Sequence, residues 1–173
     1  MKTRPWSALV CILLLGPSAF ASLPDPVTYQ SAKATIVFVH PDKFTDIRES
    51  SMSSEKGRKF MLDALAAYLI GEADTFVPDG DRLTMLFTDI TVAGFFPPQS
   101  NASRGRRYLR FVGFPDYRFA WELTGRDGVV LKKGRLDYSD KEYWSISNDT
   151  APLTIDKVEL KVWMQGQFKS PNK

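Results

Sequence analysis

The chain has 173 residues, of which 43% are hydrophobic, and this matches the size and core of a single domain. Its 23 basic and 20 acidic residues nearly balance, so composition gives no general affinity for nucleic acid. A single cysteine argues against a small disulfide-stapled module.

Residues 1–21 have the pattern of a secretory signal peptide. Lys2 and Arg4 provide a positive start, residues 8–15 form an apolar run, and small residues precede a predicted cleavage after Ala21. The run is shorter than the roughly 20 apolar residues of a membrane-spanning helix. We therefore expect an exported, periplasmic mature protein with no transmembrane segment.

Cys11 lies inside this apolar run, and its lipidation is the alternative to cleavage after Ala21. The preceding residues 8–10 lack the small residue usually placed just ahead of a lipidated cysteine, which favours cleavage. The mature chain then has no cysteine, which excludes a thiol nucleophile and zinc–thiolate sites. Loss of Lys2 and Arg4 also brings its net charge close to zero.

The mature chain begins with a segment that carries two prolines and little pattern, residues 22–33, which predicts a flexible lead-in. A single domain is expected at 34–169. Its first strand, predicted at residues 36–39 from β-branched and aromatic residues, is expected to be central in the sheet. Pro41 ends this strand, and the short polar side chains of the following loop, residues 42–46, can cap its turn, with an apolar phenylalanine tucked beneath.

A long helix is predicted next. Serines at residues 50–54 supply an N-cap, and Glu55 is favourable in the first turn. Apolar residues recur every three or four positions as far as Phe76, before Pro78 and Gly80 stop the helix. The expected buried face consists of Met61, Leu65, Leu69, Ala73 and Phe76.

A second strand is predicted at residues 83–92. Leu83, Met85 and Phe87 share one face, and Asp89 is next in that row. Either a bulge shifts the register or this carboxylate lies at the rim of the sheet. Residues 94–107 then break every pattern and predict a long loop, before a short strand candidate at 108–112.

The clearest alternation follows at residues 117–124, typical of a half-solvated antiparallel strand. Its expected inward row is Tyr117, Phe119, Trp121 and Leu123. A turn at residues 127–128 leads into a strand at 129–136, and residues 137–150 predict a loop. Residues 153–168 fit both a strand and a helix capped by Asp149 or Thr150.

Four segments in this order resemble the domain-of-unknown-function 3016 family of exported bacterial proteins: FVHPDKFTDIR, TDITVAG, YRFAWELTGRDGVVLKKGRLDY and DKVELKVW. The resemblance spans about residues 34–168. It implies that the closing segment is helical, and it brings no assigned activity. The chain departs from the family pattern at two places: the family has an acidic residue at the position of His40, and it has a more regular loop in place of residues 95–107.

Catalytic chemistry has one candidate region. His40, the single histidine, could act as a base or metal ligand beside Asp42 or Asp46, and Asp89 could join these carboxylates if the two strands are neighbours. The alternative is that the loop aspartates cap turns and Asp89 pairs with Arg48 or Arg118. No GxSxG, GxGxxG or P-loop motif supports another enzyme class, and no metal motif implies a cofactor.

Partner binding has a candidate in the 94–107 loop. Phe95 and Phe96 are adjacent aromatics that cannot both point inward from one regular element, and exposed aromatics often mark partner surfaces. A basic cluster follows at Arg104, Arg106, Arg107 and Arg110. Arginine guanidinium groups match the geometry of phosphate, so the cluster could bind phosphate-bearing partners such as nucleic acid or lipid headgroups. The alternatives are an aromatic plug over the sheet end and a solvated loop with a charged edge strand. Tyr143 and Trp144 raise the same question in the 137–150 loop.

The sequence thus predicts an α+β fold with an antiparallel sheet of four or five strands and two helices on one face. Our leading hypothesis is a non-enzymatic periplasmic protein that binds another envelope protein through the 94–107 loop, with the 137–150 loop as a further candidate. The alternative is a metal-assisted or acid–base hydrolase that uses His40, Asp42, Asp46 and Asp89. A third reading, a small-ligand carrier, requires an apolar pocket between helix and sheet.

Overall fold

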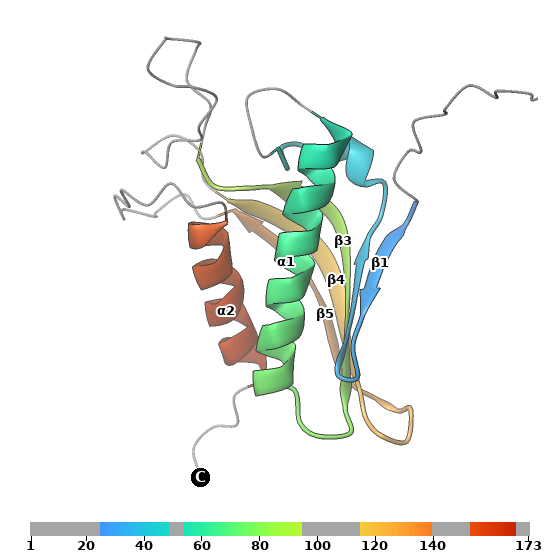
Figure 1. The fold of residues 1–173 in the computed structure, drawn as a ribbon. Coiled ribbons are helices and arrows are strands. Elements are labelled where there is room, and N and C mark those ends of the chain that lie inside the picture. Colours follow the sequence, from blue (N-terminus) through green and yellow to red (C-terminus); the bar gives the residue numbers. More distant parts are fainter. Residues whose placement is uncertain (1–24, 49–53, 95–114, 140–152, 169–173) are drawn as a thin grey trace, which may run out of the picture.

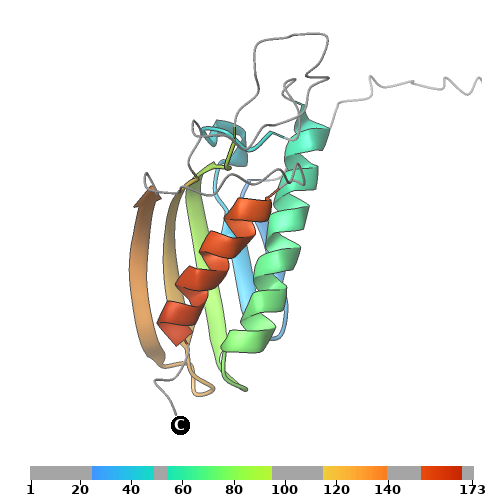
Figure 2. The ribbon, with the colours of Figure 1, turned by 90° about the vertical axis from the view of Figure 1, so that its left-hand side faces the viewer.

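The computed structural model of the chain describes residues 25–48, 54–94, 115–139 and 153–168. A five-stranded sheet forms one layer, and two helices form a second layer on one face of it (Figure 1 and Figure 2). The predicted α+β fold is therefore confirmed. None of the helices in the described ranges is long and apolar enough to cross a membrane.

The strands lie side by side in chain order. They are β1 (Val27–Gln30), β2 (Ala34–Phe38), β3 (Arg82–Thr91), β4 (Asp116–Thr124) and β5 (Val130–Ser139). Neighbouring strands are antiparallel except β2 and β3, which are parallel. The sheet is thus mostly antiparallel, with one parallel pair because a long helix carries the chain back between β2 and β3.

Three details of the predicted sheet need correction. The expected lead-in at residues 22–33 contains β1, which pairs with β2 and buries Val27. The strand expected to be first and central is β2, but β1 precedes it and β3 occupies the middle of the sheet. Residues 137–139, expected in a loop, continue β5 because they pair with the start of β4. The strand candidate at 108–112 lies outside the described residues.

The long helix begins and ends as the sequence predicts, whereas the closing helix begins at Thr154 and not after a cap at Asp149 or Thr150, because Leu153 is left-handed, with φ of 63°. Helix α1 (Glu55–Phe76) starts at Ser54, whose side chain accepts a hydrogen bond of 3.0 Å from the amide of Gly57. The predicted inward positions of α1 are buried, apart from Phe76, which is partly buried against the core. The closing segment is helix α2 (Thr154–Phe168), as the family resemblance implied.

The core lies between the helices and one face of the sheet. Alternate residues of β2 and β3 are fully buried there, and each large apolar side chain contributes about 1.5–3 kcal/mol by leaving water. Trp163 of α2 packs edge-on against Phe119 and Trp121 of β4, with ring centres 4.9 and 5.7 Å apart. Helix α2 therefore covers β4, and we call the opposite, helix-free side of the sheet the open face.

All three internal gaps between the described ranges join the chain at one end of the sheet. Strands β2, β3 and β5 finish at this end, β4 begins there, and both helices start there (Figure 1). We call it the loop end. The opposite end carries the short connections β1–β2 and β4–β5, and we call it the turn end.

Candidate functional site

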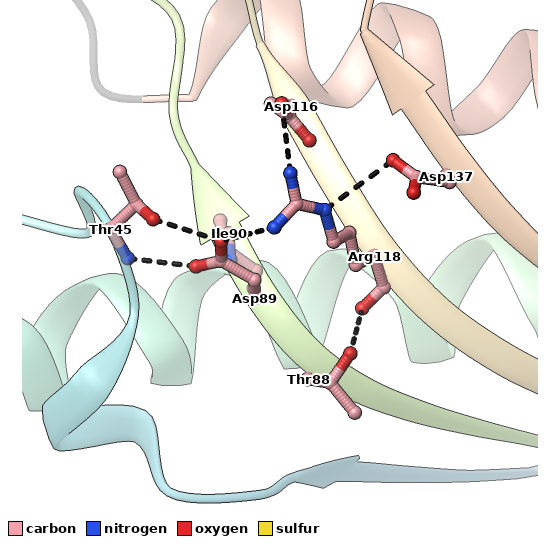
Figure 3. A network of polar contacts seen from close by, with 7 residues as sticks. All are labelled: Thr45, Thr88, Asp89, Ile90, Asp116, Arg118 and Asp137. Carbon is pink, nitrogen blue, oxygen red and sulfur yellow. Dashed lines mark hydrogen bonds and ion pairs between the residues drawn. The ribbon is translucent and has the colours of Figure 1, made fainter.

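A cluster of one arginine and three aspartates lies on the open face at the loop end. In Figure 3 these side chains stand in front of the strands, while the helices lie behind them. Arg118 of β4 is 3.4 Å from a carboxylate oxygen of Asp89 and of Asp137, and 4.0 Å from one of Asp116. The cluster thus links the ends of β3, β4 and β5.

Asp89 reaches the open face because β3 bulges. The pairing register of β3 with β4 shifts between Phe87 and Asp89, so Asp89 lies opposite Arg118 while Ile90 turns into the core. Of the two outcomes left open by the sequence, the bulge is the one observed. The prediction that Asp89 pairs with a basic residue is also confirmed, with Arg118 as the partner and Arg48 bound to Asp46.

The hydrogen bond to Asp137, followed by the charges of Asp116 and Asp89, raises the pKa of the Arg118 guanidinium above its ordinary value. Arg118 is therefore a permanent cation. A group of this kind can orient or bind an anion, but it cannot exchange protons near neutral pH. The chemistry of the cluster is electrostatic.

The loop after β2 is attached to this cluster by Asp89. The amide and the hydroxyl of Thr45 each donate a hydrogen bond of 2.8 Å to the Asp89 carboxylate (Figure 3). Asp46 extends the attachment through its backbone: its amide donates to the carbonyl of Ile90 in β3, and its carbonyl accepts from the amide of Val92 just after β3. The loop is thus held by β3, whereas the sequence predicted that its own short side chains cap it. Phe44 lies beneath the loop as predicted, at 8% exposure.

His40 is separate from this cluster. Its backbone is left-handed, with φ of 52°, and its Nδ1 atom contacts a carboxylate oxygen of Asp25, which lies just before β1. His40 and Asp42 line a shared depression of about 360 Å³ with Arg58. Asp46 and Asp89 are not among its lining residues, so the four residues of the hydrolase hypothesis do not form one site.

A buried polar contact, which sequence reasoning missed, holds α2 to the same end of the sheet. Asp156 is 1% exposed and accepts hydrogen bonds of 2.6 Å from the Tyr117 hydroxyl and 3.1 Å from the Ala93 amide. In the sequence, Asp156 has only the pattern of an acidic residue in the first turn of a helix. Its burial depends on the position of α2 over β4, which no local pattern reveals.

The predicted partner-binding residues Phe95, Phe96, Arg104, Arg106 and Arg107 lie outside the described residues, as do Arg110, Tyr143 and Trp144. Their attachment points are described. Gly94 follows β3 and Pro115 precedes β4, so the connection that carries the first set starts and finishes at the loop end. Its attachment points are next in the chain to Ala93, which bonds to Asp156, and to Asp116 of the Arg118 cluster.

The chain matches the family model described as protein of unknown function (DUF3016) over residues 32–166. The chain belongs to this family. No curated protein and no solved structure matches it. The matched range of this DUF3016 member covers the sheet from β2 onward and nearly all of α2, so it includes every residue of the Arg118 cluster.

Two observations on the described part of this DUF3016 protein concern a metal site and the carrier hypothesis. Within those ranges, no group of three or more histidine, aspartate or glutamate side chains has a metal-binding arrangement. An apolar cavity between α2 and the sheet, lined by Leu136 and Trp163, has about 140 Å³. Small-molecule sites usually occupy about 300–1,000 Å³, so this cavity does not support the carrier reading.

Proposed function

We propose that this protein is exported to the periplasm and binds another protein of the cell envelope through the segments at its loop end, without catalysing a reaction. The observation that supports the proposal is the concentration of three long connections on one end of a two-layer scaffold. Binding residues are often carried by loops that a scaffold positions in this way. Export rests on the signal-peptide pattern of residues 1–21.

The hydrogen bonds at the loop end support a role of the scaffold in positioning the connecting segments. Thr45 and Asp89 fix the loop after β2, and Asp156 fixes the start of α2 against Ala93. The connection of residues 95–114 therefore leaves from and returns to a backbone that is held in place on both sides. Phe95, Phe96 and the arginines Arg104, Arg106 and Arg107 are suited to an interface with an apolar centre and an acidic rim.

The hydrolase alternative gains no support from the described residues. A general base needs a position within hydrogen-bonding reach of the reacting group and of an orienting partner. His40 instead pairs with Asp25 in an open depression, with side-chain exposures of 55% and 37%, and Asp89 is occupied by Thr45 and Arg118.

The proposal is tested by capture from envelope extract with tagged mature protein, followed by reconstitution of binding with the purified partner. The test variant carries Phe95→Ser and Phe96→Ser. A matched control carries Val129→Ser and Val130→Ser, an adjacent apolar pair that is 56% and 43% exposed at the turn end. We expect loss of binding only in the first variant.

Equal binding by both variants, with equal melting temperatures, would overturn the proposed interface. Export is checked separately by N-terminal sequencing of the cellular protein, where we expect Ser22 as the first residue and recovery in the periplasmic fraction. A first residue at Cys11 carrying lipid would replace the soluble form with an anchored one.

A further inference from the structure

The open face of the sheet has an apolar centre. Leu86 of β3 and Ala120 of β4 lie opposite each other across the strand pair, and Val37 of β2 is paired with Leu86 on the other side. Leu86 is 37% exposed, and the small Ala120 side chain leaves a shallow depression of about 520 Å³ above it. No helix or strand of the described residues covers this face (Figure 1).

Charge is distributed unequally on the two sides of this centre. The loop-end side carries the Arg118 cluster, in which three carboxylates surround one guanidinium. The turn-end side carries the exposed cations Arg82 and Lys133 beside the carboxylate of Glu122, whereas the exposed cation Arg135 lies in the central row with Ala120. The open face is therefore acidic at one end and basic at the other.

We propose that the open face binds a second copy of this chain. The two copies are related by a two-fold axis that lies in the interface, perpendicular to the strands, and passes through the row of Leu86 and Ala120. Such an axis places the acidic end of each face on the basic end of the other, so one surface is complementary to itself. The charge pattern is what selects a second copy as the occupant.

The register of the sheet specifies the contacts in this dimer. The row Asp89–Arg118–Asp137 lies one step from the centre, and the row Thr84–Glu122–Lys133 lies one step away on the other side. The axis therefore sets Arg118 against the partner's Glu122, and Asp137 against the partner's Lys133. Asp89 meets the partner's Thr84, and the two Leu86 side chains meet at the centre.

Arg135 is the one residue whose charge opposes this arrangement, because it lies in the central row and faces its own copy. It is on β5, at the edge of the sheet, where a long side chain can turn toward water. The size of the face is also adequate. The strands have 4, 5, 10, 9 and 10 residues, so at about 3.3 Å per residue and about 4.8 Å between strands the face measures about 600 Å². Standard protein interfaces bury roughly 600–1,000 Å² on each partner.

The experiment measures the dimer dissociation constant of the mature protein by sedimentation equilibrium. Lys133→Glu and Asp137→Lys each place like charges across the interface, and we expect each to weaken the dimer at least tenfold. The double variant carrying both changes restores opposite charges, so we expect it to recover dimerisation. Both side chains are exposed in the described structure, so the fold should tolerate the changes.

Lys132→Glu is the matched control. Lys132 is the neighbouring lysine on β5, but it lies on the helix side, where its ammonium group donates to the carbonyl of Gln167 at 3.0 Å. Lys132→Glu changes the net charge by the same amount as Lys133→Glu, and we expect it to leave the dimer dissociation constant unchanged. A protein that stays monomeric at hundreds of micromolar would overturn the proposal. So would a dimer that tolerates Lys133→Glu, or a double variant that remains monomeric.

Discussion

Thr45 and Asp89 are 44 positions apart in the chain and are joined by two hydrogen bonds of 2.8 Å. The same carboxylate also accepts a hydrogen bond of 2.9 Å from the backbone amide of Ile90. One side chain thereby fixes a loop after β2 and shapes a bulge in β3. The loop after β2 is attached to the sheet through this contact.

We expect Asp89→Ala to lower the free energy of unfolding by about 2 kcal/mol, because the amides of Thr45 and Ile90 lose a charged acceptor. Asp89→Asn keeps one carbonyl acceptor and should lose roughly half as much. Urea denaturation followed by circular dichroism measures both. Asp42→Ala, at an exposed position in the same loop, is the control and should change stability little. Equal stability of Asp89→Ala and the parent protein would contradict the assigned role.

The buried contact at Asp156 predicts a larger effect. Asp156→Ala removes the acceptor of both the Tyr117 hydroxyl and the Ala93 amide, and we expect a loss of about 3 kcal/mol. Tyr117→Phe removes one donor only, and about 1–2 kcal/mol should be lost. The double variant should be less destabilised than the two single losses added together, because the residues share one contact. Additive losses in the unfolding measurements would show that the contact is not coupled.

The packing of Trp121 over β5 predicts that Gly134 cannot be replaced. A Cβ atom at Gly134 would lie 2.9 Å from Nε1 of Trp121, so Gly134→Ala should displace the indole and destabilise the protein by about 1–3 kcal/mol. In Gly134→Ala the wavelength of maximal tryptophan fluorescence should shift, and the melting temperature should fall. Gly71→Ala in α1 is the matched control, because a Cβ atom there has no neighbour within 4 Å. Helix propensity favours alanine by about 1 kcal/mol, so this control should be stabilised.

Asp63 of α1 predicts a pH dependence. Its partial burial would raise the pKa of the carboxyl, but the hydrogen bonds from Lys59 and Tyr29 outweigh that effect and lower the pKa. The stabilisation is therefore fully present above the ordinary aspartate pKa, near 4, and is lost as the pH falls through the lowered value. We expect the free energy of unfolding of Asp63→Asn to fall less than that of the parent protein as the pH is lowered through this range. Denaturant unfolding at a series of pH values measures both. An identical acid response of the two proteins would contradict this.

Local patterns were sufficient where burial follows a regular period. The spacing from Met61 to Ala73 located α1, and the alternation from Tyr117 to Leu123 located β4 with the correct inward face. In both elements the same side chains that mark the period fill the core. The sequence could therefore predict the layers of the fold.

Local patterns failed where the structure or role of a residue depends on a contact that is distant in the sequence. Strand β1 is four residues long between proline and polar residues, and only its pairing with β2 makes it a strand. The pairing of His40 with Asp25 depends on that strand, because it places residue 25 beside the end of β2. For the candidate site, the link from Asp89 to Arg118 was predictable as one of two pairings, whereas the role of Asp156 was not.

The parallel pairing of β2 and β3 also bears on the order in which the protein folds. Strands β4 and β5 can join through a short turn, whereas β2 can reach β3 only after the 22 residues of α1 have crossed the sheet. Closing that long loop loses more chain entropy than closing a hairpin. We therefore expect the β4–β5 hairpin to form early, the β2–β3 junction to form late, and transient opening of the native protein to begin at β1 and β2.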